Sequence, residues 1–180
     1  HKLRNKALKA LNDTVFYPSK GKERLKSMIE TRPDWCVSRQ RVWGVPLPIF
    51  IHKKTKEILV DDWVNENIAN IYEKEGSDCW FSDDPQKFLG DKHKAQDYEK
   101  LSDIVEVWFD SGSTHSFVLE KRKDLKWPAS MYLEGSDQHR GWFHSSLLES
   151  CGTRGRAPFE SILSHGFVVD GKGLKMSKSV

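Results

Sequence analysis

The string Lys175-Met176-Ser177-Lys178-Ser179 places two lysines three residues apart on a loop. Asp170-Gly171-Lys172-Gly173 comes just before it, so the lysines follow a glycine-rich turn. A lysine ammonium is a flexible point charge, suited to a phosphate that gains charge as it leaves. Two lysines at this spacing are more often solvated residues on a surface loop. The string also does not match the P-loop pattern G-x-x-x-x-G-K-[ST]. What favours the phosphate interpretation is the full five-residue string directly after an apolar segment.

A second candidate site lies where an apolar segment ends on Glu134-Gly135-Ser136-Asp137-Gln138. Two carboxylates three residues apart at a strand end, followed by a glutamine in a helix's first turn, can bind vicinal hydroxyls such as those of a ribose. Gly135 permits close backbone approach to a ligand. An alternative is that Asp137 merely caps the helix and Glu134 is an exposed surface residue. These residues alone favour neither interpretation.

Two tryptophans and a histidine complete the candidates for a small-molecule site. Trp108 could wall an apolar pocket at a strand end, although a tryptophan is more often part of the core. Trp142 lies on the apolar side of the helix predicted to follow Gln138. His165 could contact the adenine side of a ligand, and the alternative is a core histidine with satisfied hydrogen bonds.

Basic and aromatic residues also alternate in one proline-rich segment, at Trp35, Arg39, Arg41 and Trp43. This interleaving suits stacking on single-stranded RNA. A hinge between domains explains the same residues at least as well.

Neither the histidines nor the cysteines predict a metal site. His139 and His144 lie five residues apart, which does not place them on one helix face, and no cysteine pair has zinc spacing. Three scattered cysteines also argue against a disulfide framework and favour a reducing compartment. No apolar run is long enough to span a membrane, so we expect a cytoplasmic protein without structural zinc.

Composition is that of a folded protein with one large or two small domains. The chain has 180 residues, 37% of them hydrophobic and 31% charged. Its net charge of +3 only weakly suggests a polyanionic partner. Because no G-x-S-x-G elbow occurs, a serine hydrolase is excluded.

In the first hundred residues, apolar periodicity predicts helices over 1–11 and from a cap at Ser19 to before Pro33. Prolines make 31–50 an ordered loop running into a strand around Ile49–Ile51. Residues 52–100 are polar, with a turn at 53–57 and a helix over 63–74.

In the second part, apolar runs predict strands over 104–109, 131–133 and 159–169. Helices are predicted over 114–120 and 138–150. An order of strand, acidic turn, helix and strand is typical of an open parallel sheet, whose ligands lie beyond the carboxyl ends of the strands. The fold class predicted is therefore α/β.

Taken together, these strings resemble the class I aminoacyl-tRNA synthetases. Lys175 to Ser179 matches their KMSKS signature at every letter, and Pro33 to Gly44 is similar to the subgroup that activates isoleucine, valine or leucine. Trp108 to Gly112 and Glu134 to Phe143 resemble the isoleucine-specific members. The resemblance covers essentially the whole chain and implies the second half of a Rossmann-like catalytic domain.

The resemblance also implies a division of the chain. Residues 1–30 would end the connection to an editing domain and form a linking helix, and 31–51 a connecting loop and strand. Residues 52–100 would be a small polar α+β insertion, and 101–180 the second half of the catalytic domain, ending in the KMSKS loop.

The implied reaction has two steps. Isoleucine attacks the α-phosphate of ATP-Mg, and the acyl group of the adenylate then passes to tRNA-Ile. By resemblance, Lys175 and Lys178 would be catalytic, stabilising the pyrophosphate side of the transition state. The same comparison assigns the adenylate's ribose to Glu134, Gly135 and Asp137, the amino-acid head group to Gln138, the adenine to His165, and the side-chain pocket to Trp108 and Trp142.

One family motif is missing from the sequence. No His-x-Gly-His string occurs in it, so we expect this motif and the editing domain to precede His1. A piece of this kind would be inactive alone, and the whole enzyme would act as a monomer. The remaining alternatives are a valine-specific synthetase and a stand-alone tRNA-binding module.

Overall fold

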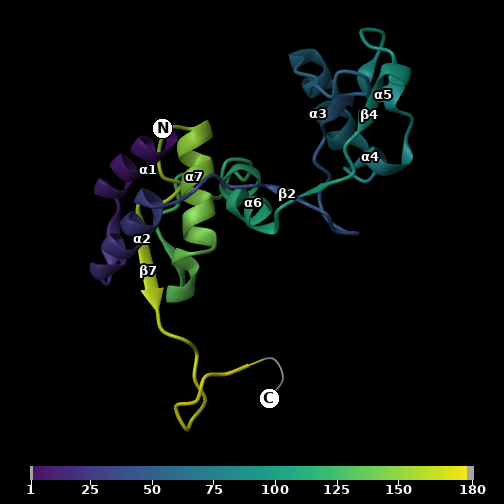
Figure 1. Ribbon diagram of the computed structural model, residues 1–180. Helices are drawn as coiled ribbons and strands as arrows, with labels where there is room; N and C mark the ends of the chain where they lie inside the picture. The colour runs from purple at the N-terminus through teal and green to yellow at the C-terminus, as the bar shows by residue number, and fades with distance from the viewer. Residues whose placement is uncertain (1, 178–180) are drawn as a thin grey trace. The chain divides into compact units, whose positions relative to one another are not determined.

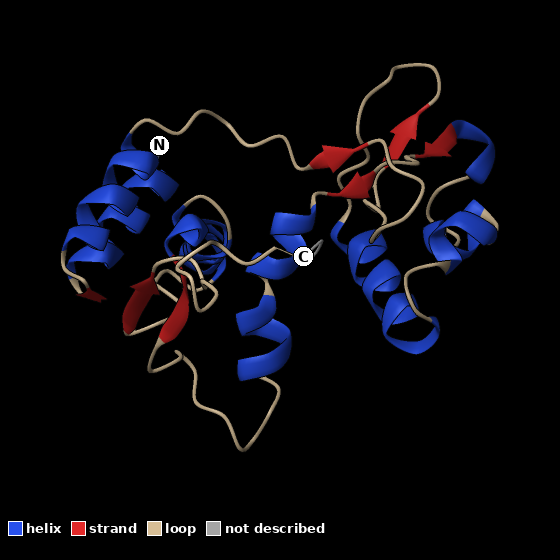
Figure 2. Ribbon diagram, turned by 90° about the horizontal axis from the view of Figure 1, so that it is seen from below, coloured by secondary structure: helices blue, strands red, loops and turns tan. Residues whose placement is uncertain are grey.

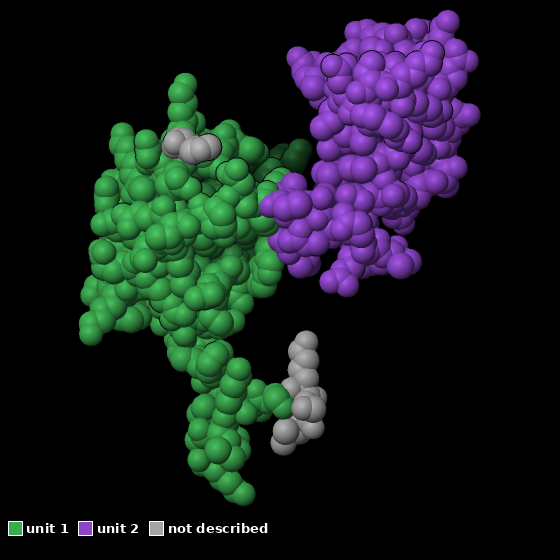
Figure 3. Space-filling model, viewed as in Figure 1, with its two compact units in different colours: residues 1–35, 108–180 green, residues 36–107 purple. Residues whose placement is uncertain are grey.

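The computed structural model describes residues 2–177. These fall into two compact units, residues 1–35 with 108–180 and residues 36–107 (Figure 3). Each unit has its own cluster of buried apolar side chains, so each is described by itself.

The first unit contains a three-stranded parallel sheet (Figure 1). Its order is β1 (Val15–Tyr17), β7 (Ser161–His165), β6 (Tyr132–Gly135), with the last strand in sequence at the centre. This confirms the predicted α/β class with an open parallel sheet. The short strand β1 was not predicted, because three residues carry too little periodicity to detect.

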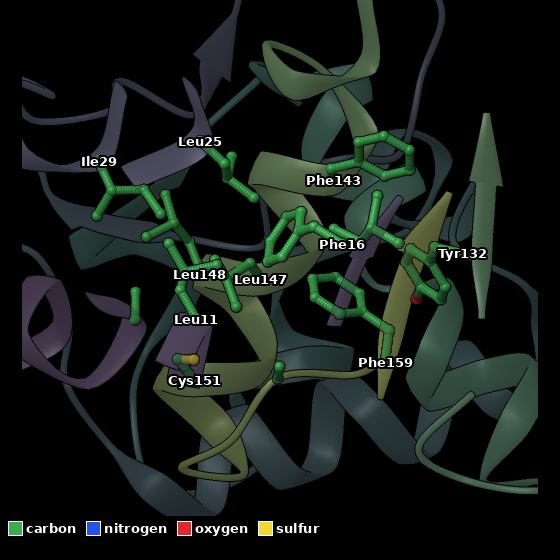
Figure 4. Close-up of a cluster of buried hydrophobic side chains, with 13 residues drawn as sticks. Leu11, Phe16, Leu25, Ile29, Tyr132, Phe143, Leu147, Leu148, Cys151 and Phe159 are labelled. Atoms are coloured by element: carbon green, nitrogen blue, oxygen red, sulfur yellow. The ribbon is translucent and has the colours of Figure 1, made fainter. Parts of the chain in front are cut away.

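Three helices supply most of the core beside this sheet: α1 (Lys2–Asn12), α2 (Lys20–Glu30) and α7 (Trp142–Thr153). The predicted apolar stripes of α1 and α2 face inward except at Leu3, which is exposed. Leu11, Leu25 and Ile29 are almost fully buried (Figure 4). The predicted cap residue Ser19 lies at the start of α2, but its side chain makes no capping hydrogen bond. Helix α7 is buried on nearly every side, since it packs on α1 and contributes Phe143, Leu147 and Cys151 to the core.

Three predicted elements of this unit have different bounds. Strand β6 runs two residues further than predicted, through Gly135. The helix predicted over 138–150 is preceded by the 3₁₀ turn η3 (Ser136–His139) and starts only at Trp142. The helix predicted over 114–120 is the π-helical turn η2 (His115–Leu119).

The strand predicted over 104–109 is wrong beyond Val105. Strand β5 (Ile104–Val105) pairs with β2 (Ser38–Arg39) and, through Ile104, bridges Pro46, and the chain then turns into helix α6 (Val107–Gly112). An apolar run stays a strand only where another strand satisfies its backbone. Trp108 therefore lies in the first turn of a helix and not at a strand end.

The strand predicted over 159–169 is also too long. The pairing of β6 with β7 ends at Gly135 and His165, because β6 itself ends at Gly135 and a longer β7 would have no partner there. From Gly166 onward the described chain is exposed outside the sheet (Figure 1).

The second unit is α+β (Figure 2). Strand β3 (Phe50–His52) pairs with β4 (Tyr98–Lys100), and helices α3 (Asp62–Glu75), α4 (Cys79–Ser82), α5 (Pro85–Leu89) and the turn η1 (Ala95–Asp97) complete it. The predicted turn at 53–57 and the predicted helix at 63–74 are confirmed. Its core packs Trp80 edge-on against Phe50, and the Trp80 indole N–H donates to the Leu101 carbonyl at 2.8 Å. That this unit is an insertion in a larger domain stays a prediction.

Candidate functional site

The parallel sheet brings together two predicted segments that lie thirty residues apart. Gly135 is opposite His165 at the carboxyl ends of β6 and β7, so the predicted acidic turn and the predicted histidine share one edge. Ligands of open parallel sheets bind at this edge. His165 is exposed, which rules out the alternative of a core histidine.

Gly135 allows the acidic turn to fold back on the strand end. A Cβ atom added there would lie 2.5 Å from Asp137 Oδ1 and 3.9 Å from His165 Cε1. Glu134 and Asp137 are exposed, and the Gly135 N–H donates to Glu134 Oε2 at 3.3 Å. Two exposed carboxylates therefore lie at the sheet edge, positioned to accept hydrogen bonds from hydroxyl groups.

Helix α7 is capped by Gln138 and not by Asp137. Gln138 Oε1 accepts a hydrogen bond from the Trp142 backbone N–H at 3.0 Å, and its amide donates to Asp137 Oδ2 at 3.2 Å. The interpretation that Asp137 merely caps the helix is therefore wrong. Both the oxygen and the nitrogen of the Gln138 amide are therefore hydrogen-bonded within the protein. Its role beside an amino-acid head group stays a prediction.

Trp142 is held rigidly by residues that sequence reasoning did not identify. Its ring stacks on Tyr132 with centroids 3.9 Å apart and planes at 3°, and its indole N–H donates to the Ser111 carbonyl at 3.0 Å. Trp108 is 41% exposed and lies against Gly141, the residue before Trp142. Both predicted wall residues thus flank the start of α7. The only sequence feature that pointed to Tyr132 was its place as an aromatic residue at the start of the predicted strand.

The lysine loop is partly described. Residues 168–176 form a hairpin in which Asp170 Oδ1 accepts from the N–H groups of Lys172 and Leu174, at 2.8 and 2.9 Å. Lys175 Nζ lies 3.8 Å from the centroid of the Phe167 ring, a cation–π contact. Lys178 and Ser179, the remaining signature residues, lie outside the described residues.

Three histidines of the first unit, His115, His139 and His144, are buried. Burial lowers the pKa of His144 to about 4, and burial likewise lowers the pKa values of His115 and His139. His139 Nδ1 lies 2.8 Å from the Ser136 carbonyl, which holds the η3 turn. Over residues 2–177, no cluster of three or more histidine, cysteine or acidic residues could hold a metal ion.

The predicted basic and aromatic segment is divided between the two units. Trp35 belongs to the first unit and packs against Phe109, with ring centroids 6.0 Å apart. Arg39, Arg41 and Trp43 belong to the second, where Trp43 is 91% exposed. The four residues therefore do not belong to one compact unit.

An apolar cavity of about 500 Å³ lies elsewhere in the first unit. Residues of α1, α2, α6 and α7 line it, among them Leu3, Ile29, Phe109 and Leu148. None of the residues predicted to bind ATP or isoleucine lines this cavity, although Trp35 does, so it is separate from the carboxyl edge of the sheet. In the described part of the chain, no helix is long and apolar enough to cross a membrane.

Comparison with known sequences decides the family. The family described as "tRNA synthetases class I (I, L, M and V)" matches residues 1–180. The chain belongs to the class I tRNA synthetases. The chain is 88% identical to an isoleucine–tRNA ligase of Pelagibacter ubique over 180 residues, all of this chain and 20% of that protein. It is 59% identical to the isoleucine–tRNA ligase of Brucella abortus over 99% of this chain and 18% of that protein.

The fold has a counterpart among solved structures. A leucine synthetase of Agrobacterium radiobacter K84, solved as a ternary complex with tRNA and LeuAMS, matches with a TM-score of 0.52 at 20% identity. The match covers 82% of this chain and 21% of that one. This class I synthetase shares the fold, while the present chain spans about a fifth of the length of its curated relatives.

Proposed function

We propose that this chain is part of an isoleucine–tRNA ligase, an isoleucyl-tRNA synthetase that activates isoleucine with ATP and transfers it to tRNA-Ile. The observation that carries the proposal is 88% identity, over every residue of the chain, to a protein of that name. Predicted nucleotide-binding residues at the carboxyl edge of a parallel sheet support it independently. We further propose that the full enzyme is a cytoplasmic monomer.

In the activation step, the sheet edge would hold the adenylate. Glu134 and Asp137 would accept hydrogen bonds from the ribose hydroxyls, and Gly135 would let the ligand approach the backbone. His165, at the end of the central strand, would lie beside the adenine.

Charge and apolar contact would complete the site. Lys175 and Lys178 would stabilise the negative charge that develops on pyrophosphate as it leaves ATP-Mg. Trp108 and Trp142 would wall the pocket for the isoleucine side chain, and Gln138 would lie beside the amino-acid head group. The 180-residue chain alone would not catalyse the reaction, because it contains no His-x-Gly-His string.

The test is amino-acid-dependent ATP–pyrophosphate exchange by the full-length protein, with isoleucine and valine compared. We expect exchange to favour isoleucine and Glu134→Gln to raise the KM for ATP, since the ribose would lose an ionised acceptor. Faster exchange with valine would establish the valine enzyme instead. Salt-sensitive tRNA binding without any exchange would establish an RNA-binding module.

A further inference from the structure

Gly141, between η3 and α7, occupies a position where no side chain fits. A Cβ atom there would lie 2.6 Å from Gln138 Oε1 and 2.7 Å from both Cη2 and Cζ3 of Trp108, distances that real Cβ atoms essentially never show. The space around Gly141 therefore excludes any side chain.

The groups around Gly141 differ in how easily they could move. Trp142 is fixed by its stack on Tyr132 and by its hydrogen bond to the Ser111 carbonyl. Gln138 is fixed by the hydrogen bond that caps α7. Trp108 is 41% exposed and presents the far edge of its ring to Gly141. A methyl group at 141 would therefore press on the Trp108 ring as well as on the Gln138 amide oxygen, and it would change how Trp108 lies against the start of α7.

We propose that Gly141 is a positioning residue that sets amino-acid specificity by seating Trp108 against the start of α7. This rests on the proposed function, in which Trp108 and Trp142 wall the side-chain pocket. A pocket distinguishes side chains that differ by one methylene only through close apolar contact, and a gap of a fraction of an ångström forfeits much of that contact. Gly141 would thus determine how closely one pocket wall meets isoleucine.

The test uses the full-length protein carrying Gly141→Ala, assayed by ATP–pyrophosphate exchange without tRNA. We expect the ratio of kcat/KM for isoleucine to that for valine to fall by about tenfold, since the lost contact is of the size of one methylene. The KM for ATP should change much less than the isoleucine-to-valine ratio, because the proposed ribose and adenine contacts Glu134, Gly135 and His165 lie on β6 and β7. An equal fall in kcat/KM for both amino acids would overturn the proposal.

Gly152→Ala is the matched control in the same helix. A Cβ atom there would lie 3.7 Å from Leu3 Cδ1, an ordinary van der Waals contact. We expect wild-type kinetics for both amino acids. A similar loss of the isoleucine preference in this control would mean that any change in α7 alters the pocket, which would also overturn the proposal.

A second variant covers the case in which Gly141→Ala does not fold. Trp108→Phe removes the two ring atoms that the new methyl would meet and leaves the Gln138 Oε1 contact in place. Adding Gly141→Ala to Trp108→Phe should therefore lower the melting temperature less than adding it to the wild type. Additive losses would overturn the steric argument. A wild-type enzyme without isoleucine-dependent exchange would overturn the proposed function itself, whereas an active enzyme with an unchanged ratio would overturn only the role of Gly141.

Discussion

The hydrogen bonds of neighbouring residues decide which polar side chains of the candidate site remain exposed. Glu134 and Asp137 are three residues apart and of one charge, yet neither caps a helix, because Gln138 accepts the backbone N–H that needs a cap. Both carboxylates thereby remain exposed at the sheet edge. In the proposed function, the lysines of the KMSKS loop would supply the complementary positive charges.

Lys178→Ala in the full-length protein should lower the rate of isoleucine activation about a hundredfold or more, as expected for a group that acts on transition-state charge. The isoleucine affinity should change little. Pre-steady-state formation of the adenylate, with isoleucine binding measured separately, checks this. Equal losses of rate and affinity would mean that Lys178 acts in ground-state binding.

His144 should make the stability of the protein depend on pH. Because burial lowers its pKa from 6.5 to about 4, the unfolded state binds a proton more readily between those values. The contribution of His144 to the free energy of unfolding should therefore be at its maximum above pH 6.5 and fall by about 3 kcal/mol as the pH drops to 4. Urea unfolding at several pH values checks this, and His144→Leu should flatten the dependence. An unchanged slope in that variant would refute the assignment.

Helices and strands of this chain end where their backbone partners end. Strand β7 stops at His165 because β6 stops opposite it, and helix α7 starts at Trp142 because Gln138 caps its first turn. In the second unit, the N-cap of helix α3 is Asp61, whose carboxylate accepts from the N–H groups of Trp63 and Val64. The same carboxylate lies 2.9 Å from His93 Nε2, and this hydrogen bond is the main cause of its lowered pKa.

Asp61→Ala should destabilise the second unit by about 1–2 kcal/mol, the usual cost of removing a capping side chain. Thermal unfolding followed by circular dichroism checks this. Asp62→Ala is the control, because Asp62 is exposed and lies inside the first turn, where it contributes only to the helix dipole. Equal destabilisation by both variants would contradict a specific role for the cap.

At the scale of the whole molecule, the chain leaves the first unit after residue 35 and returns at residue 108. The two ends of the second unit meet in one antiparallel pair, Ser38 with Val105, and the Glu106 N–H donates to the Val37 carbonyl at 2.8 Å. Adjacent ends and a separate apolar core are typical of a unit that can fold alone.

Residues 36–107 expressed alone should therefore unfold in one cooperative thermal transition. Near-ultraviolet circular dichroism, which reports on the packed Trp80, is the measurement. Phe50→Ala, which removes the ring packed against Trp80, should lower the midpoint strongly. A gradual loss of signal without a midpoint would show that this unit depends on the rest of the chain.

The sequence by itself determined the helices with a clear apolar period, the parallel α/β class and the strings that point to a nucleotide-binding edge. Local patterns suffice there, because a helix satisfies its own backbone and its buried stripe repeats along the chain. Only the tertiary structure decided that 107–109 are helical, that β7 ends at His165, and that Gln138 caps α7. The first two depend on partners distant in the sequence, and a strand's residues do not say where its neighbour stops. The third depends on which side chain of the η3 turn reaches the Trp142 N–H. The need for glycine at 141 has the same origin, since it comes from the Trp108 ring of another helix.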